Sequence, residues 1–190
     1  MGSGFLNDWH FTKPEVKEMW RKTFHDFNNG KSVAILTILA RTFYQDSKYQ
    51  EATAYSNKSV ELLLTQRVFS SPRLGDKERS AYWLLADATY NNHFRILHKQ
   101  GIFEPIIELG RQSVKMVEED FGIREDGFTK SHNGDFARLT LMLTYLGQLP
   151  RKVIRKEVLK YNYLPFLKTM RQRKNKRHGM IDHVLSSLKP

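Results

Sequence analysis

The chain has 190 residues, 40% of them hydrophobic and 12% aromatic, and a formal net charge of +11. This length and apolar content suffice for one buried core, so we expect one domain or one piece of a longer repeat array. The absence of cysteine excludes a disulfide framework and a thiolate metal site, and no run approaches the roughly 18 apolar residues of a membrane-spanning helix.

The first third of the chain contains four predicted helices. After an N-terminal extension, residues 1–12, apolar positions three and four apart predict an amphipathic helix over residues 14–27. Residues 34–44 form a second helix that is apolar on nearly every side, as expected of a helix covered by its neighbours. Two shorter helices are predicted over residues 48–56 and 60–65.

The central stretch divides into three apolar segments, which are residues 81–90, residues 93–99 and a helix after Gly101. The pair Asn91-Asn92 and Gly101 are the expected breaks, because Asn and Gly tolerate the turns that close helices. The third helix has a proline in its first turn, where a missing N–H group is tolerated.

The same pattern returns in the C-terminal half. Residues 136–146 are the long apolar helix, residues 153–159 the short one, and residues 164–170 a third helix, again with an early proline. The wider spacing between these copies fits a loop insertion at residues 121–135, whose three glycines predict a mobile segment. Asp135 is expected to cap the helix that follows.

This order of long helix, short helix, glycine and proline-led helix resembles one boundary of an armadillo repeat array. The resemblance implies an all-α fold, a right-handed α-solenoid of about four armadillo-like units and about ten helices, forming a single domain over residues 1–190. The spacing of apolar residues between Leu36 and Ala52 also resembles a tetratricopeptide repeat, which recurs at about 34 residues as two equal helices.

In armadillo folds the third helix of a unit lines a concave groove, and a Trp-x-x-x-Asn pair on it commonly holds an extended peptide. The nearest match is Trp83 with Asp87, and Asp can accept a hydrogen bond from a peptide N–H but cannot donate one. Asn91 and Arg138 complete this candidate protein-binding set. The alternative is that Trp83 is a core residue, because large aromatics dominate burial.

The sequence contains no recognisable catalytic or cofactor-binding motif. No HExxH, CxxC, GxSxG, GxxxxGK[ST] or GxGxxG motif occurs. His93 and His98 are five residues apart on a helical stretch and so point in different directions. We therefore expect no catalytic residue, no metal site and no cofactor, and hence no enzyme.

The positive charge is concentrated in the last quarter of the chain. Residues 150–190 hold 12 Lys or Arg against two acidic residues, whereas the rest of the chain is nearly balanced. A basic run gives the candidate contacts to an acidic partner or nucleic acid, which are Arg171, Arg173, Lys174, Lys176 and Arg177. Such a run is typical of a solvated loop, of an electrostatic surface for nucleic acid or acidic lipid, or of a nuclear localisation patch.

Stacked helical repeats present a long continuous surface that binds proteins without a pocket. The sequence therefore predicts a non-enzymatic protein–protein interaction scaffold or adaptor, cytoplasmic or nuclear, that binds another protein or peptide on its helical surface. The alternative is a nucleic-acid-binding helical repeat protein that uses the basic C-terminal quarter.

Overall fold

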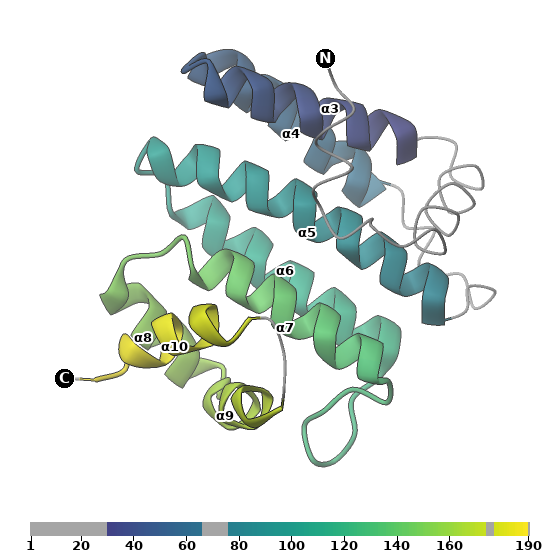
Figure 1. Cartoon of the computed structure of the whole chain (residues 1–190), viewed down its shortest axis with the longest axis vertical. Helices are drawn as coiled ribbons and strands as arrows, with labels where there is room; N and C mark the ends of the chain where they lie inside the picture. The colour runs from purple at the N-terminus through teal and green to yellow at the C-terminus, as the bar shows by residue number, and fades with distance from the viewer. Residues whose placement is uncertain (1–29, 66–75, 174–176, 190) are drawn as a thin grey trace. The chain divides into compact units, whose positions relative to one another are not determined.

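A computed structural model describes residues 30–65, 76–173 and 177–189. Over these ranges it contains eight α-helices and no β-strand, which confirms the all-α class (Figure 1). The chain divides into two compact units, Met1–Ile96 and Leu97–Pro190, and each is considered by itself. The expected N-terminal extension and the helix over 14–27 lie outside the described residues.

The first unit contains α3 (Gly30–Gln45), α4 (Tyr49–Thr65) and all but the last residues of α5 (Asp76–Lys99). Helices α3 and α4 lie side by side, joined by a short turn (Figure 1). Ser47 takes a left-handed backbone conformation there, with φ 60°, and the Lys48 N–H donates to the Phe43 carbonyl at 2.8 Å. Two fully buried alanines, Ala40 and Ala52, pack with Ile96 in the core, where their small side chains permit close packing.

Two of the predicted breaks in this unit are wrong. Helix α5 continues through the Asn91-Asn92 pair, and α4 continues across the expected gap between residues 56 and 60. The Asn92 side chain donates to the Thr37 carbonyl of α3 at 3.1 Å, so it ties α5 to a neighbouring helix instead of closing a turn. The first two expected copies of the repeat therefore lack a separate short middle helix.

The described part of the second unit contains five further helices. They are α6 (Glu104–Phe121), α7 (His132–Leu146), α8 (Arg151–Lys160), α9 (Leu164–Gln172) and α10 (His178–Ser186). The break at Gly101 is confirmed, since this residue has φ 73°. Pro105 and Pro165 lie in the first turns of α6 and α9, as predicted, and Gly122 ends α6 with φ 65°.

Helix α7 is the centre of the second unit and is buried along most of its length. It packs closely on α6, because Gly110 leaves room for the buried Tyr145 ring. Helix α10 packs on α9 and also returns to α7, a helix that precedes it by three elements. This return contact differs from a regular solenoid, in which each unit touches only its neighbours.

The expected insertion at 121–135 is only partly a loop. Helix α7 begins at His132 after Ser131, so Asp135 lies in the first turn of the helix and the prediction that it caps the helix is wrong. The remaining segment, residues 122–131, is called the α6–α7 loop below. Its backbone is tied by hydrogen bonds from Lys130 N–H to the Gly122 carbonyl (3.0 Å) and from Arg124 N–H to the Phe128 carbonyl (2.8 Å).

Candidate functional site

The pair predicted to hold a peptide lies in the interior of the first unit. Trp83 is 2% exposed and Asp87 is 1% exposed, and the Trp83 ring meets the Tyr82 ring edge to face at 5.0 Å. Asn91 is half-buried on the same helix. Trp83 is therefore a core residue, which is the alternative that the sequence left open. The side chains of Trp83 and Asp87 are not exposed for a partner to contact.

A buried polar network joins α3, α4 and α5 in the first unit. The Thr37 hydroxyl lies 2.7 Å from that of Ser59 and 3.1 Å from that of Thr89, while Ser56 Oγ lies 2.6 Å from His93 Nδ1. Burial lowers the pKa of His93 to about 4, so the imidazole is neutral near pH 7. The hydroxyl–imidazole pair resembles a nucleophile and its base, but both residues are buried, and we assign it a structural role.

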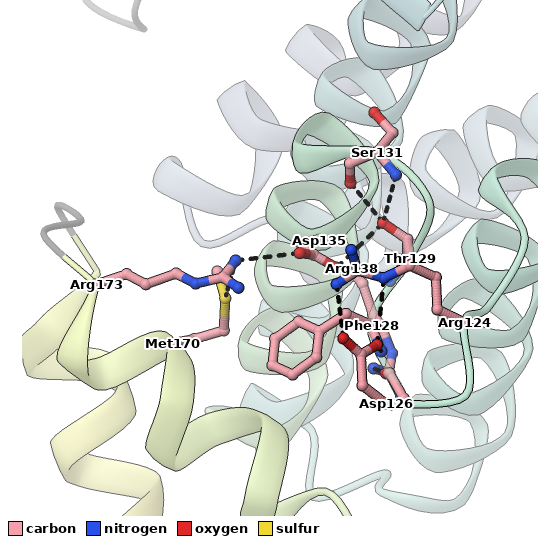
Figure 2. A network of polar contacts seen from close by, with 10 residues as sticks. Arg124, Asp126, Phe128, Thr129, Ser131, Asp135, Arg138, Met170 and Arg173 are labelled. Carbon is pink, nitrogen blue, oxygen red and sulfur yellow. Dashed lines mark hydrogen bonds and ion pairs between the residues drawn. The ribbon is translucent and has the colours of Figure 1, made fainter.

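Arg138 is used within the second unit to hold the α6–α7 loop (Figure 2). Its guanidinium forms a 2.7 Å ion pair with Glu118 and donates to the Gly127 carbonyl at 2.8 Å. It also lies over the Phe166 ring, 4.4 Å from the ring centre. Because a cation over an aromatic ring is stabilised further, Arg138 joins α6, the loop, α7 and α9.

Asp135 is the second anchor of the α6–α7 loop (Figure 2). Its Oδ1 accepts hydrogen bonds from the Thr129 N–H at 2.8 Å and from the Thr129 hydroxyl at 3.1 Å. Its Oδ2 accepts from Arg173 at 3.1 Å, and the same arginine lies 4.8 Å from the centre of the Phe128 ring. The buried carboxylate thereby connects the loop to the end of α9.

The basic run at the end of α9 is partly neutralised by carboxylates of the second unit. Arg171 forms an ion pair with Asp182 and Arg173 one with Asp135, while Arg177 lies against the Met180 sulfur at 3.7 Å. Arg171 belongs to the last turn of α9, so its predicted place in a loop is wrong. The other two predicted contacts, Lys174 and Lys176, lie outside the described residues.

A different set of exposed cations lies on α8. Each of its members is exposed and forms no salt bridge with any residue that the structure describes. We call this set the α8 basic face, and it comprises Arg151, Lys152, Arg155, Lys156 and Lys160. Leu159 lies among these cations and is 57% exposed, so the basic face includes one apolar side chain that is open to solvent.

The single acidic residue of α8 does not compensate this charge. Glu157 is 1% exposed and accepts two hydrogen bonds from Arg111 of α6, at 2.7 and 2.8 Å. This paired geometry raises the pKa of Arg111 above its ordinary value, mainly through the hydrogen bond. Glu157 therefore fixes the inner side of α8 and leaves no acidic side chain on its outer side.

Tyr161, directly after α8, is 37% exposed and contacts three neighbouring side chains. The Arg111 guanidinium carbon lies 4.9 Å and the Lys160 amine 5.3 Å from the centre of its ring, and the ring stacks on that of Tyr163 at 5.8 Å. The contact with Arg111 holds the end of α8 against α6.

The repetition of cations one and four residues apart, RKxxRKxxxK, is present in the sequence and could have indicated this face. The prediction instead placed the contact at the denser run that follows α9. Sequence alone does not show that Asp135 and Asp182 neutralise part of that run, or that Glu157 points inward.

Neither a metal centre nor a membrane-spanning helix is found in the described part of the chain. No group of three or more His, Asp or Glu side chains is placed to hold a metal ion. No helix combines the length and apolar character needed to cross a membrane.

Comparison with known proteins gives no relative for this chain. No family model matches it, and no curated protein or solved structure shows significant similarity to it. The resemblance to armadillo and tetratricopeptide arrays therefore rests on the order and spacing of its helices.

Proposed function

We propose that this chain is a non-enzymatic interaction module, a scaffold or adaptor that binds another protein on its helical surface in the cytoplasm or nucleus. The observation that carries the proposal is the α8 basic face with Leu159 exposed among its cations. A surface that combines exposed positive charge with an exposed apolar side chain is complementary to a partner that supplies both carboxylates and an apolar side chain.

We further propose that the helices form a right-handed α-solenoid. The order α7, short α8 and proline-led α9 follows the armadillo pattern. The uninterrupted α4 and α5 are closer to the two-helix unit of tetratricopeptide arrays. Both kinds of array bind proteins along stacked helices, so the proposed function does not depend on the choice.

Nucleic-acid binding is the second candidate, because the same five cations could neutralise phosphates. The two candidates differ in the chemical nature of what contacts the surface. We therefore propose to place a photo-crosslinking amino acid at Leu159 and, in a separate variant, at Ile35 of α3, which is also 57% exposed.

Irradiation of cells that express these variants should give adducts that protease removes, that nuclease leaves intact and that an excess of unlabelled chain suppresses. Adducts removed by nuclease would replace the scaffold function with nucleic-acid binding. Absence of any saturable adduct from both positions would refute an interaction function at either surface.

A further inference from the structure

We propose that the α8 basic face docks an acidic amphipathic segment of a partner protein, one apolar side chain of which covers Leu159. This inference rests on the proposed function and specifies its binding surface. It is drawn from the exposed cations of α8, which form no salt bridge with a described residue, from the exposure of Leu159 and from the contacts that hold the inner side of the helix.

The cations surround Leu159 in a regular way. Successive residues of an α-helix are rotated by about 100°, so Arg155 projects on one side of Leu159 and Lys156 on the other. Cations at i and i+4 repeat along the helix axis, which spans about 15 Å. A partner helix of similar length with carboxylates on both sides of one apolar residue would match this arrangement.

Helix α8 is already held in the orientation that presents this face. Ile154 and Val158 are fully buried on its inner side, and Glu157 is held by Arg111. Binding therefore requires no reorientation of the helix, and the ordering cost is limited to long side chains of the basic face.

A lipid surface fits this face less well than a protein. A helix that lies on a membrane buries its apolar side in the lipid, but the apolar side of α8 is used in the core of the second unit. Leu159 alone is a small apolar anchor.

Nucleic acid also fits less well, because a phosphate backbone would leave Leu159 uncovered. The nearest aromatic ring, Tyr161, is 37% exposed but already contacts Arg111, Lys160 and Tyr163, so a stacking base would have to share the ring with these groups. Carboxylates satisfy the arginines equally well, since guanidinium pairs with carboxylate through two parallel hydrogen bonds. We therefore select an acidic protein segment as the occupant.

The test uses the full chain and four purified probes. They are an acidic helical peptide of about 14 residues with one central leucine, the same peptide with serine in place of leucine, a single-stranded RNA of matched charge, and phosphatidylserine vesicles. Binding is measured by fluorescence anisotropy for the peptides and RNA and by co-sedimentation for the vesicles, at about 50 and about 300 mM salt.

The leucine peptide should bind about tenfold more tightly than the serine peptide, because burial of Leu159 contributes only with the former. The variant Leu159→Ser should remove this difference. The double variant Lys152→Glu and Lys156→Glu should abolish peptide binding at low salt. A matched control with the same change in net charge, Lys58→Glu with Lys115→Glu, should stay within about twofold of the parent, because both lysines lie outside α8.

Three results would overturn the inference. Equal affinity for the two peptides, or an equal loss of binding in the matched control, would show that net charge alone determines binding. Stronger binding of RNA or vesicles than of the leucine peptide would show that the occupant is not an acidic protein segment. If peptide binding fails while saturable protein adducts form at Ile35, only the docking surface is wrong, whereas failure of both experiments refutes the proposed function.

Discussion

Gly110 allows α6 and α7 to approach each other, and its replacement by alanine is the most direct test of the packing in the second unit. A Cβ atom at this position would lie 2.3 Å from Tyr145 Cγ and 2.5 Å from Tyr145 Cβ. Both atoms are near the α7 backbone, and the tyrosine side chain is fully buried. Rotation of the ring therefore cannot remove the clash, and α6 and α7 must separate.

The expected change in the free energy of unfolding has two opposing parts. Overpacking of a dense core costs about 1–3 kcal/mol, and contacts this short place Gly110→Ala near the upper value. Alanine is better than glycine inside a helix by about 1 kcal/mol. The net expectation is a loss of about 2 kcal/mol, or a fall in Tm of roughly 4–8 °C for a chain of this size.

Urea and thermal unfolding followed by far-UV circular dichroism would measure this loss. Gly179 supplies the matched control, because it lies in α10 and no atom lies within 4 Å of the Cβ that alanine would add there. Gly179→Ala should be neutral or stabilising by up to about 1 kcal/mol. Equal stabilisation by both substitutions would refute the close approach of α6 and α7 at Gly110.

Three further outcomes follow from buried charges and polar groups. Glu157→Gln should cost about 2 kcal/mol in chemical unfolding, because it breaks a buried ion pair while Arg111 remains partly exposed to water. Since burial lowers the pKa of His93 from 6.5 to about 4, the unfolded chain binds the extra proton, and stability should fall by about 3 kcal/mol as pH drops from 6.5 to 4. In His93→Gln that component of the pH dependence should be absent from unfolding curves measured across the same range, whatever the stability of the variant at pH 7. Asp135→Ala removes the acceptor of two hydrogen bonds from Thr129, so tryptic cleavage in the α6–α7 loop should become about tenfold faster, as followed by gel electrophoresis. An unchanged cleavage rate would show that this carboxylate does not hold the loop.

The helix boundaries that the sequence predicts well are those set by local backbone chemistry. Gly101 and Gly122 adopt positive φ, which favours glycine; Gly101 separates two helices as predicted, and Gly122 ends α6. Pro105 and Pro165 each stand in a first turn, where the missing N–H group leaves no hydrogen bond broken. These preferences depend on one or two residues and need no knowledge of the tertiary structure.

The errors arise where distant contacts decide between local alternatives. Asn91 and Asn92 have a weak preference for a turn, but the Asn92 side chain bonds to Thr37, 55 residues earlier, and Ile96 fills the core beyond it. Asp135 is a good cap by residue type, yet its carboxylate is used by Thr129 and Arg173. In both cases tertiary contacts outweigh local preferences of about 1 kcal/mol or less.

The candidate site likewise combines features that follow from local sequence with features that depend on distant contacts. The amphipathic pattern of α8 could be predicted from spacing alone, whereas the inward position of Glu157 depends on Arg111, 46 residues earlier. The burial of Trp83 likewise follows from the packing of the first unit. The spacing of Trp83 and Asp87 in the sequence does not show which side of their helix faces solvent.

Charge density in the sequence and available charge on the surface are therefore different quantities. The run after α9 is the denser in cations, but Arg171 and Arg173 are each held by a carboxylate of the same unit. The α8 basic face is less conspicuous in the sequence, and its cations have no such partner among the described residues. An acidic partner that binds α8 need not displace an existing ion pair, whereas one that binds Arg173 must compete with Asp135. Electrostatic attraction at α8 therefore meets no competition of the kind that Asp135 and Asp182 exert on Arg173 and Arg171, even though both segments contribute to the same net charge.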